Sequence, residues 1–170
     1  SSIISQQLGY FHVGVFLLDE QRQYAILRSA SSASGLQMLA TGYRLPVTAK
    51  NIISFAAQSG QPQLALDTGT NPDLLSGNAA HARSQLVLPL KAGDEIVGVL
   101  DLQSNEVNAF SEDDISTLVI LADQIGIAIQ NALLYEQSQS ALREANLTFR
   151  QASEKEWKGY TETIQAKAYR

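Results

Sequence analysis

The chain has 170 residues, of which 45% are hydrophobic and 17% are charged. A chain of this length buries roughly 70% of the surface that its unfolded form exposes, so one globular domain with an appended element is expected. The absence of cysteine excludes disulfides, thiolate metal sites and a nucleophilic thiol. The net charge of -5 disfavours nucleic acid and anionic membranes as partners, and no uninterrupted apolar run approaches the roughly 20 residues of a membrane span.

The front of the chain is rich in turn-forming residues, because all four Pro and nine of the eleven Gly precede residue 99. Residues 10–18 and 24–31 are β-prone segments joined by a short polar connection, which predicts a hairpin. Residues 31–42 are expected to form a loop, and residues 43–47 a short extended piece. Residues 51–59 have apolar side chains at helical spacing and precede Gly60, so they predict a two-turn helix.

A long polar loop, residues 67–83, is expected next, because the segment is rich in Gly, Asn, Asp and Ser. Loops of this length inside a compact domain are usually functional, and this one is predicted to act as a mobile lid. Residues 84–91 and 96–104 then predict a second hairpin, with Leu86, Leu88 and Leu90 on one face.

A long helix is predicted from Ser111 onward. Ser111 and Asp114 have the spacing of a capping box, and an amphipathic stripe follows them. Farther along, Tyr135, Leu142 and Phe149 are seven residues apart, which is the spacing of a dimeric coiled coil. The heptad fails near residues 153–159, where the sequence predicts a stutter or a break.

These elements predict an α+β domain with a central antiparallel sheet, followed by a long C-terminal helix. The stretches 16–19, 42–47, 52–62, 83–90, 98–104 and 110–114, with the helix to residue 135, resemble a GAF domain in their order and spacing. The similarity covers about residues 8–137 and is greatest to the GAF domains of bacterial sensor histidine kinases and related multidomain signalling proteins.

The resemblance implies a GAF/PAS-like sheet of five to six strands, with a ligand pocket between one face and the short helix plus the long loop. It divides the chain into a sensory domain, 1–137, and a signalling helix or linker, 138–170. It further implies a parallel homodimer through the terminal helices, neighbouring signalling domains and a cytoplasmic location. The polar residues expected at the pocket, for a small ligand of anionic or mixed character, are Tyr43, Asp67, Thr68, Arg83 and Gln85.

Several alternatives stay open at the level of the residues. Arg83 could clamp an anionic ligand, but a surface salt bridge to Asp67 or Asp73 is the commoner fate of such a side chain. His12 and His81 could each ligate haem, yet a His without a signature motif is a weak signal, so haem is disfavoured. Asn105, Phe110 and Asp114 only partly match the motif of cyclic-nucleotide-binding relatives and are interpreted as structural.

Relatives that attach a bilin or reduce a sulfoxide depend on cysteine, so both activities are excluded for this chain. No catalytic triad, phosphate loop or paired-His motif is present in the sequence, and we expect no enzyme activity and no metal in this domain, although its parent protein could be a histidine kinase. Two functions remain. The first is a sensory module that binds a small molecule and signals through a dimeric helix; the second is a ligand-free dimerisation and signal-transmitting module with a filled pocket.

Overall fold

The computed structural model describes residues 12–68 and 82–168, with side chains as far as residue 150. One antiparallel sheet of six strands runs in the order β3-β2-β1-β6-β5-β4, which confirms the predicted fold class. The elements in chain order are β1 (His12–Leu18), β2 (Tyr24–Ala30), α2 (Ala33–Ala40), β3 (Arg44–Pro46), α3 (Ile52–Ser59), β4 (Gln63–Ala65), β5 (Ser84–Ala92), β6 (Glu95–Ser104) and α4 (Glu112–Ala168).

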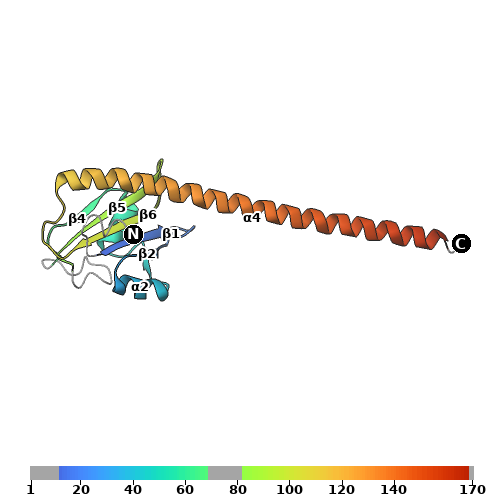
Figure 1. The fold of residues 1–170 in the computed structure, drawn as a ribbon, viewed down its shortest axis with the longest axis horizontal. Helices are drawn as coiled ribbons and strands as arrows, with labels where there is room; N and C mark the ends of the chain where they lie inside the picture. The colour runs from blue at the N-terminus through green and yellow to red at the C-terminus, as the bar shows by residue number, and fades with distance from the viewer. Residues whose placement is uncertain (1–11, 69–81, 169–170) are drawn as a thin grey trace. The chain divides into compact units, whose positions relative to one another are not determined.

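Helices cover both faces of the sheet (Figure 1). On one face, α2 and α3 pack over a core that includes Phe16, Ile53 and Val87. On the other face, the first part of α4 packs through Leu118 and Ala122 over the second core. Leu86, Leu88 and Leu90 all belong to this second core, as their alternation in the sequence predicted.

The two predicted hairpins are present. β1 pairs with β2 and β5 pairs with β6, both antiparallel, while β1 also pairs with β6 and so joins the hairpins into one sheet. The central strands of the sheet are therefore β1 and β6. The short edge strands are β3, which pairs with β2, and β4, which pairs with β5.

Helix α3 begins and ends where the sequence predicted. The Asn51 side chain accepts a hydrogen bond from the Ser54 amide at 2.9 Å, and Gly60 ends the helix in the left-handed conformation with φ of 64°. Glycine adopts this conformation without the steric cost that a Cβ would add. These two caps account for the short length of the helix.

The expected loop at residues 31–42 is wrong, because residues 33–40 form helix α2. Ser32 caps this helix through a hydrogen bond from the Gly35 amide to its Oγ, at 3.1 Å. The serines and glycine of the segment suggested a loop, but they serve as a helix cap and as a point of close approach to β1. A Cβ at position 35 would clash with the His12 ring and with Ala30, so a small residue is required there.

Helix α4 begins with the predicted capping box. The Asp114 amide donates to Ser111 Oγ at 3.2 Å, and the Ser111 amide donates to Asp114 Oδ2 at 3.0 Å. The helix then continues without interruption to Ala168, so the break considered near residues 153–159 is wrong. The loss of heptad pattern there does not interrupt the backbone hydrogen bonds, because the segment contains no proline.

The contacts divide the chain into two compact units, Ser1–Gln130 and Asn131–Arg170. The first unit contains the sheet, α2, α3 and the packed part of α4. The second unit consists of the rest of α4 as far as it is described. Any ligand site on the sheet therefore belongs to the first unit.

Candidate functional site

A cluster of buried polar side chains lies on the face of the sheet that α2 and α3 cover. Its members are Gln85 on β5, Asp101 and Gln103 on β6, and His12 on β1, and we call these four residues the polar cluster. The sheet register explains the grouping, because Gln103 is paired with both His12 and Gln85 across the strands. In a strand, successive side chains alternate between faces, so Asp101 and Gln103 face away from the apolar Leu100 and Leu102.

Asp101 holds the two glutamine side chains in place. Gln85 Nε2 donates to Asp101 Oδ1 at 2.6 Å, and Gln103 Nε2 donates to Asp101 Oδ2 at 2.8 Å. All three residues are at most 1% exposed. Within the part of the chain that the structure describes, the two glutamine Oε1 atoms are buried without any hydrogen-bond partner. The cluster therefore has two unused acceptors, and a buried unpaired acceptor costs about 1–3 kcal/mol.

Burial controls the protonation of this cluster. Desolvation raises the pKa of Asp101 above its ordinary value, while the two glutamine hydrogen bonds and nearby His12 act in the opposite direction. Desolvation also lowers the pKa of His12, against the attraction of Asp101. Asp101 thus loses its proton less readily than an exposed carboxyl, and His12 favours the neutral imidazole.

His12 connects the polar cluster to α2. Its Nδ1 shares a hydrogen bond of 2.6 Å with the Oγ of Ser32, the same atom that caps α2. The ring lies beside Gly14 and Gly35, whose missing side chains leave it space. The position of α2 is therefore coupled to a residue of the cluster through one hydrogen bond and one close contact.

Tyr43 lies on the same side of the sheet, between α2 and β3. It packs against the first core, and its ring meets Phe16 edge to face at 6.5 Å between centroids. Burial raises the pKa of the Tyr43 phenol, and the charge of Asp101 adds to the effect. Tyr43 and Gln85, both expected at the pocket, therefore share one face of the sheet with Asp101.

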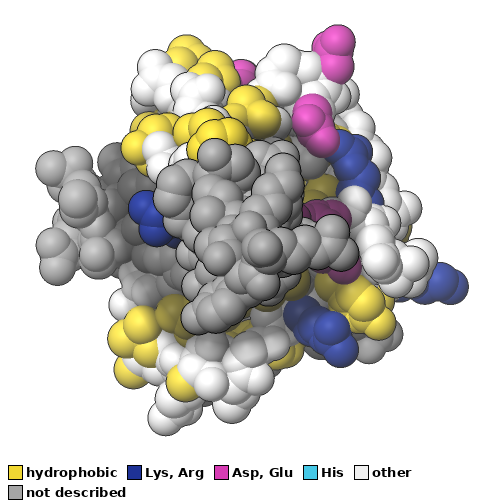
Figure 2. Space-filling view, turned by 90° about the vertical axis from the view of Figure 1, so that its right-hand side faces the viewer, with side chains coloured by type: hydrophobic (Ala, Val, Ile, Leu, Met, Phe, Trp, Pro, Cys, Tyr) yellow, Lys and Arg dark blue, Asp and Glu magenta, His cyan; other side chains and the backbone are white. Residues whose placement is uncertain are grey.

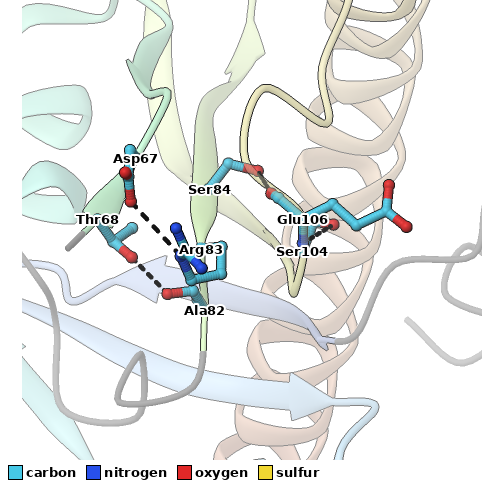
Figure 3. A network of polar contacts seen from close by, with 7 residues as sticks. All are labelled: Asp67, Thr68, Ala82, Arg83, Ser84, Ser104 and Glu106. Atoms are coloured by element: carbon cyan, nitrogen blue, oxygen red, sulfur yellow. Dashed lines mark hydrogen bonds and ion pairs between the residues drawn. The ribbon is translucent and has the colours of Figure 1, made fainter.

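The other three expected residues form a separate network where the long loop leaves and rejoins the sheet (Figure 3). The Thr68 amide donates to the Arg83 carbonyl at 2.9 Å, and the Thr68 hydroxyl donates to the Ala82 carbonyl. Arg83 Nε lies 3.6 Å from Asp67 Oδ1, and both side chains are partly exposed. Arg83 is thus engaged in the surface ion pair that was the commoner of its two predicted fates.

The predicted lid, 67–83, is described only at its two ends. Residues 69–81 lie outside the described residues, and with them Asp73 and His81. The residues that flank the loop are held firmly, because the Arg83 amide also donates to the Ser104 carbonyl at 2.7 Å. Ser84 Oγ donates to the Glu106 carbonyl at 2.7 Å and ties the start of β5 to the segment after β6.

Two members of the polar cluster, Asp101 and Gln103, were not among the expected site residues. The sequence contains a signal for them, since each is a polar residue at an alternate position in a strand whose other face is apolar. Phe110 and Asp114, by contrast, stabilise the fold, as expected from the sequence. Phe110 is buried in the second core and Asp114 caps α4.

Charged side chains are spread over the described surface that Figure 2 presents, where acidic and basic side chains are interspersed among hydrophobic ones. Across the described residues, no group of three or more His, Asp or Glu side chains is suited to hold a metal ion. By length and composition alone, the helical segment Glu112–Arg150 could cross a membrane. The sequence pattern did not predict this, because the chain contains no long uninterrupted apolar run. The same helix buries Leu118 and Ala122 against the sheet, as the core helix of a globular domain does.

A six-stranded antiparallel sheet, with two short helices over a buried polar cluster and a long helix on the opposite face, defines the class of GAF/PAS-like domains. The chain belongs to the GAF domain family, whose family model matches residues 2–130. This finding confirms the resemblance that the sequence motifs indicated.

Solved structures with the same fold come from signalling proteins and from enzymes. The second GAF domain of DevS from Mycobacterium smegmatis is 20% identical, with a TM-score of 0.65 over 81% of this chain and 93% of that one. The GAF domain of a phosphoenolpyruvate-protein phosphotransferase from Coxiella burnetii is 17% identical, with a TM-score of 0.67 over 79% and 80%. A free methionine-R-sulfoxide reductase from Neisseria meningitidis, solved with its substrate, is 25% identical, with a TM-score of 0.60 over 74% and 70%. A comparison with curated proteins found no match.

The family model and these structures establish the fold of this domain, which is also found in a methyl-accepting chemotaxis protein that is 22% identical. Some proteins with this fold are enzymes, as the sulfoxide reductase illustrates. This chain contains no cysteine. The one described hydroxyl that shares a hydrogen bond with an imidazole, Ser32 Oγ with His12 Nδ1, also accepts from the Gly35 amide as the N-cap of α2.

Proposed function

We propose that this GAF domain is the cytoplasmic sensory module of a bacterial signalling protein and that it binds a small molecule over the polar cluster. The observation that carries the proposal is the pair of buried, unpaired Oε1 atoms on Gln85 and Gln103, held in place by Asp101. Unpaired polar atoms in a core are costly and rare, so a role in binding accounts for their presence. Tyr43 is the proposed contact from the side of α2.

Asp67, Thr68 and Arg83 are proposed at the rim of the same site. Arg83 lies two residues before Gln85 on the chain, and its backbone is fixed by hydrogen bonds to Thr68 and Ser104. A charged side chain on a fixed backbone loses little additional entropy when it binds. Its partner Asp67 lies 3.6 Å away in a partly exposed pair, which is weak enough to exchange for a ligand group.

The proposed output is a parallel homodimer through α4. Tyr135, Leu142 and Phe149 are 66%, 55% and 73% exposed in the single chain. Their spacing of seven residues is that of a coiled-coil seam, which a second copy of the same helix would cover. Exposed Ile120, Ile127 and Leu134 are also seven residues apart, one position out of phase with Tyr135, Leu142 and Phe149, and they add apolar surface nearer the start of the helix.

A physical path links the proposed ligand site to this helix. Gln85 and Asp101 face α2 and α3, whereas the neighbouring Leu86 and Leu100 of the same strands face α4. A ligand that shifts β5 or β6 by a fraction of an ångström therefore alters the surface on which α4 packs. Only a preference of a few kcal/mol for one helix arrangement is needed to change the populations.

The second candidate function is a ligand-free dimerisation and transmitting module. It is favoured by the large side chains that fill the core beneath α2 and α3, including Phe16, Leu27 and Ile53. The two candidates differ in whether a small molecule stays with the purified protein, but both require the dimer.

Native mass spectrometry of the whole chain, expressed in a bacterial host and purified without denaturation, tests the proposal. We expect a dimer that carries a small molecule, and we expect Gln85→Leu to lose that molecule while the dimer remains. A dimer whose mass equals two bare chains, unchanged by bacterial small-molecule extracts, would favour the ligand-free module.

A further inference from the structure

We propose that the ligand presents a hydrogen-bond-donating, positively charged nitrogen group, such as a protonated amine or an amidinium, to the polar cluster. This inference rests on the proposed function, because it names the chemistry of a ligand at the same site. It follows from three features of the cluster: the free acceptors, the buried carboxylate, and the lack of any ion pair to that carboxylate among the described residues.

The free hydrogen-bonding atoms of the cluster are acceptors. Each glutamine places its Nε2 on Asp101, so each amide group is fixed with its Oε1 directed away from the carboxylate. Both Oε1 atoms are buried and have no partner among the described residues. Gln85 and Gln103 are also directly opposite each other on β5 and β6, so their side chains leave the same face of the sheet side by side. The complement of two neighbouring acceptors is a group with two or more N–H donors.

Asp101 lacks a positively charged partner. The ion pairs among the described residues are Arg22–Glu95 and Arg83–Asp67, and neither includes Asp101. His12, a described base whose charge would act on Asp101, is kept toward its neutral form because burial lowers its pKa, and its Nδ1 shares a hydrogen bond with Ser32. A buried carboxylate without a counter-ion is costly, and a ligand cation would supply the missing charge.

The same features disfavour an anionic group at the cluster. A carboxylate or phosphate would meet the charge of Asp101 and two carbonyl-type oxygens, all of which repel it. One N–H of each glutamine amide is already donated to Asp101, which leaves fewer donors to attract an anion. An anionic part of a mixed ligand would have to lie elsewhere, at the partly exposed Arg83.

Three probes of one shape and different charge test the inference: acetamidine, which is protonated at neutral pH, acetamide and acetate. Each is titrated into the whole chain while the side-chain NH₂ signals of Gln85 and Gln103 are followed by NMR. We expect acetamidine to shift both signals saturably and acetate to leave them unchanged. Asp101→Asn should weaken acetamidine binding by about tenfold or more, because a charge-assisted contact is lost. The matched variant Asp67→Asn, at the surface ion pair, should change it less than about twofold.

The outcomes separate the two proposals. Saturable binding of acetate but not acetamidine, or acetamidine binding that Asp101→Asn leaves unchanged, overturns the ligand chemistry and leaves a binding site. If none of the three probes shifts the glutamine signals and native mass spectrometry finds no retained molecule, both the ligand chemistry and the proposed function are overturned. A retained molecule without a basic nitrogen overturns the ligand chemistry alone.

Discussion

Replacement of Asp101 by Asn is expected to stabilise the ligand-free domain. Asn has the same shape as Asp but no charge, so it removes the cost of a carboxylate that is 1% exposed. After one glutamine amide turns over, Asn can accept from one Gln side chain and donate to the other, so the cluster keeps two hydrogen bonds. Because the buried charge is removed while the number of hydrogen bonds is kept, we expect a gain of about 2 kcal/mol in the free energy of unfolding at pH 7.

The gain should depend on pH. Because burial raises the pKa of Asp101 in the folded state, the unfolded chain ionises first, near the ordinary value of 3.8. Below that pH the carboxyl is neutral in both the folded and the unfolded state, so the stability advantage of the variant over the wild type is smallest. As the pH rises from 3.8 through the folded pKa, ionisation stabilises the unfolded wild type, so the advantage of the variant grows and then levels off. His12 acts oppositely in both proteins: its lowered pKa makes stability fall as the pH drops below 6.5.

Urea denaturation of the wild type and Asp101→Asn, followed by circular dichroism between about pH 4 and pH 8, measures this difference. At pH 7 the melting temperature should rise by about 4–8 °C for a chain of this size. Asp123→Asn, on the exposed surface of α4, is the control and should change stability by less than about 0.5 kcal/mol. A loss of stability in Asp101→Asn at pH 7 would refute the reasoning, since it would mean that the carboxylate is already compensated.

Further predictions concern α4. Ser111→Ala should lower the free energy of unfolding by about 1 kcal/mol in urea, because it removes the cap of the helix. Gly126→Ala should destabilise by about 1–3 kcal/mol, since a Cβ there would collide with the backbone of Lys91. The double change Leu142→Glu and Phe149→Glu should give a folded monomer by light scattering, because charges in the seam oppose the proposed dimer.

Each of these predictions has its own control or contrary result. Ser116→Ala, whose hydroxyl bonds only to the backbone within the helix, should leave the stability nearly unchanged. An increase in stability for Gly126→Ala, as an exposed helical glycine gives, would show that α4 does not press on the hairpin. Leu147 is as exposed as Leu142 but lies outside the seven-residue stripe, so Leu147→Glu should remain a dimer. An unchanged mass for the double variant would contradict the proposed interface.

Elements that depend on local signals could be predicted from the sequence. The second hairpin follows from the alternation of Leu86, Leu88 and Leu90, and the start of α4 follows from the spacing of Ser111 and Asp114. Helix α2 was missed because its signals are ambiguous. The same serines and Gly35 that suggest a loop are used to cap the helix and to admit the His12 ring.

The candidate site could be predicted only in part, because it depends on contacts between strands that are distant in the sequence. Gln85 and Tyr43 were expected at a pocket, and both lie on the face of the sheet that α2 and α3 cover. Ligand binding at these residues stays a prediction. The register of β5 and β6 places Gln85 opposite Gln103, and both side-chain amides then donate to Asp101. The residue pattern of a single strand does not specify how that strand aligns with its neighbour. The alternation within β6 does indicate that Asp101 and Gln103 share a face, and it could have added both to the expected site.

The short edge strands limit how this domain can associate. β3 and β4 each contain three residues, and β3 ends at Pro46, which has no amide hydrogen to donate to another strand. Neither edge offers a neighbouring molecule a long row of free backbone groups, so growth of the sheet from one copy into the next is discouraged. Association between copies of this domain then depends on side chains and not on pairing of strands, so a change in a helix surface can alter assembly without competition from the sheet.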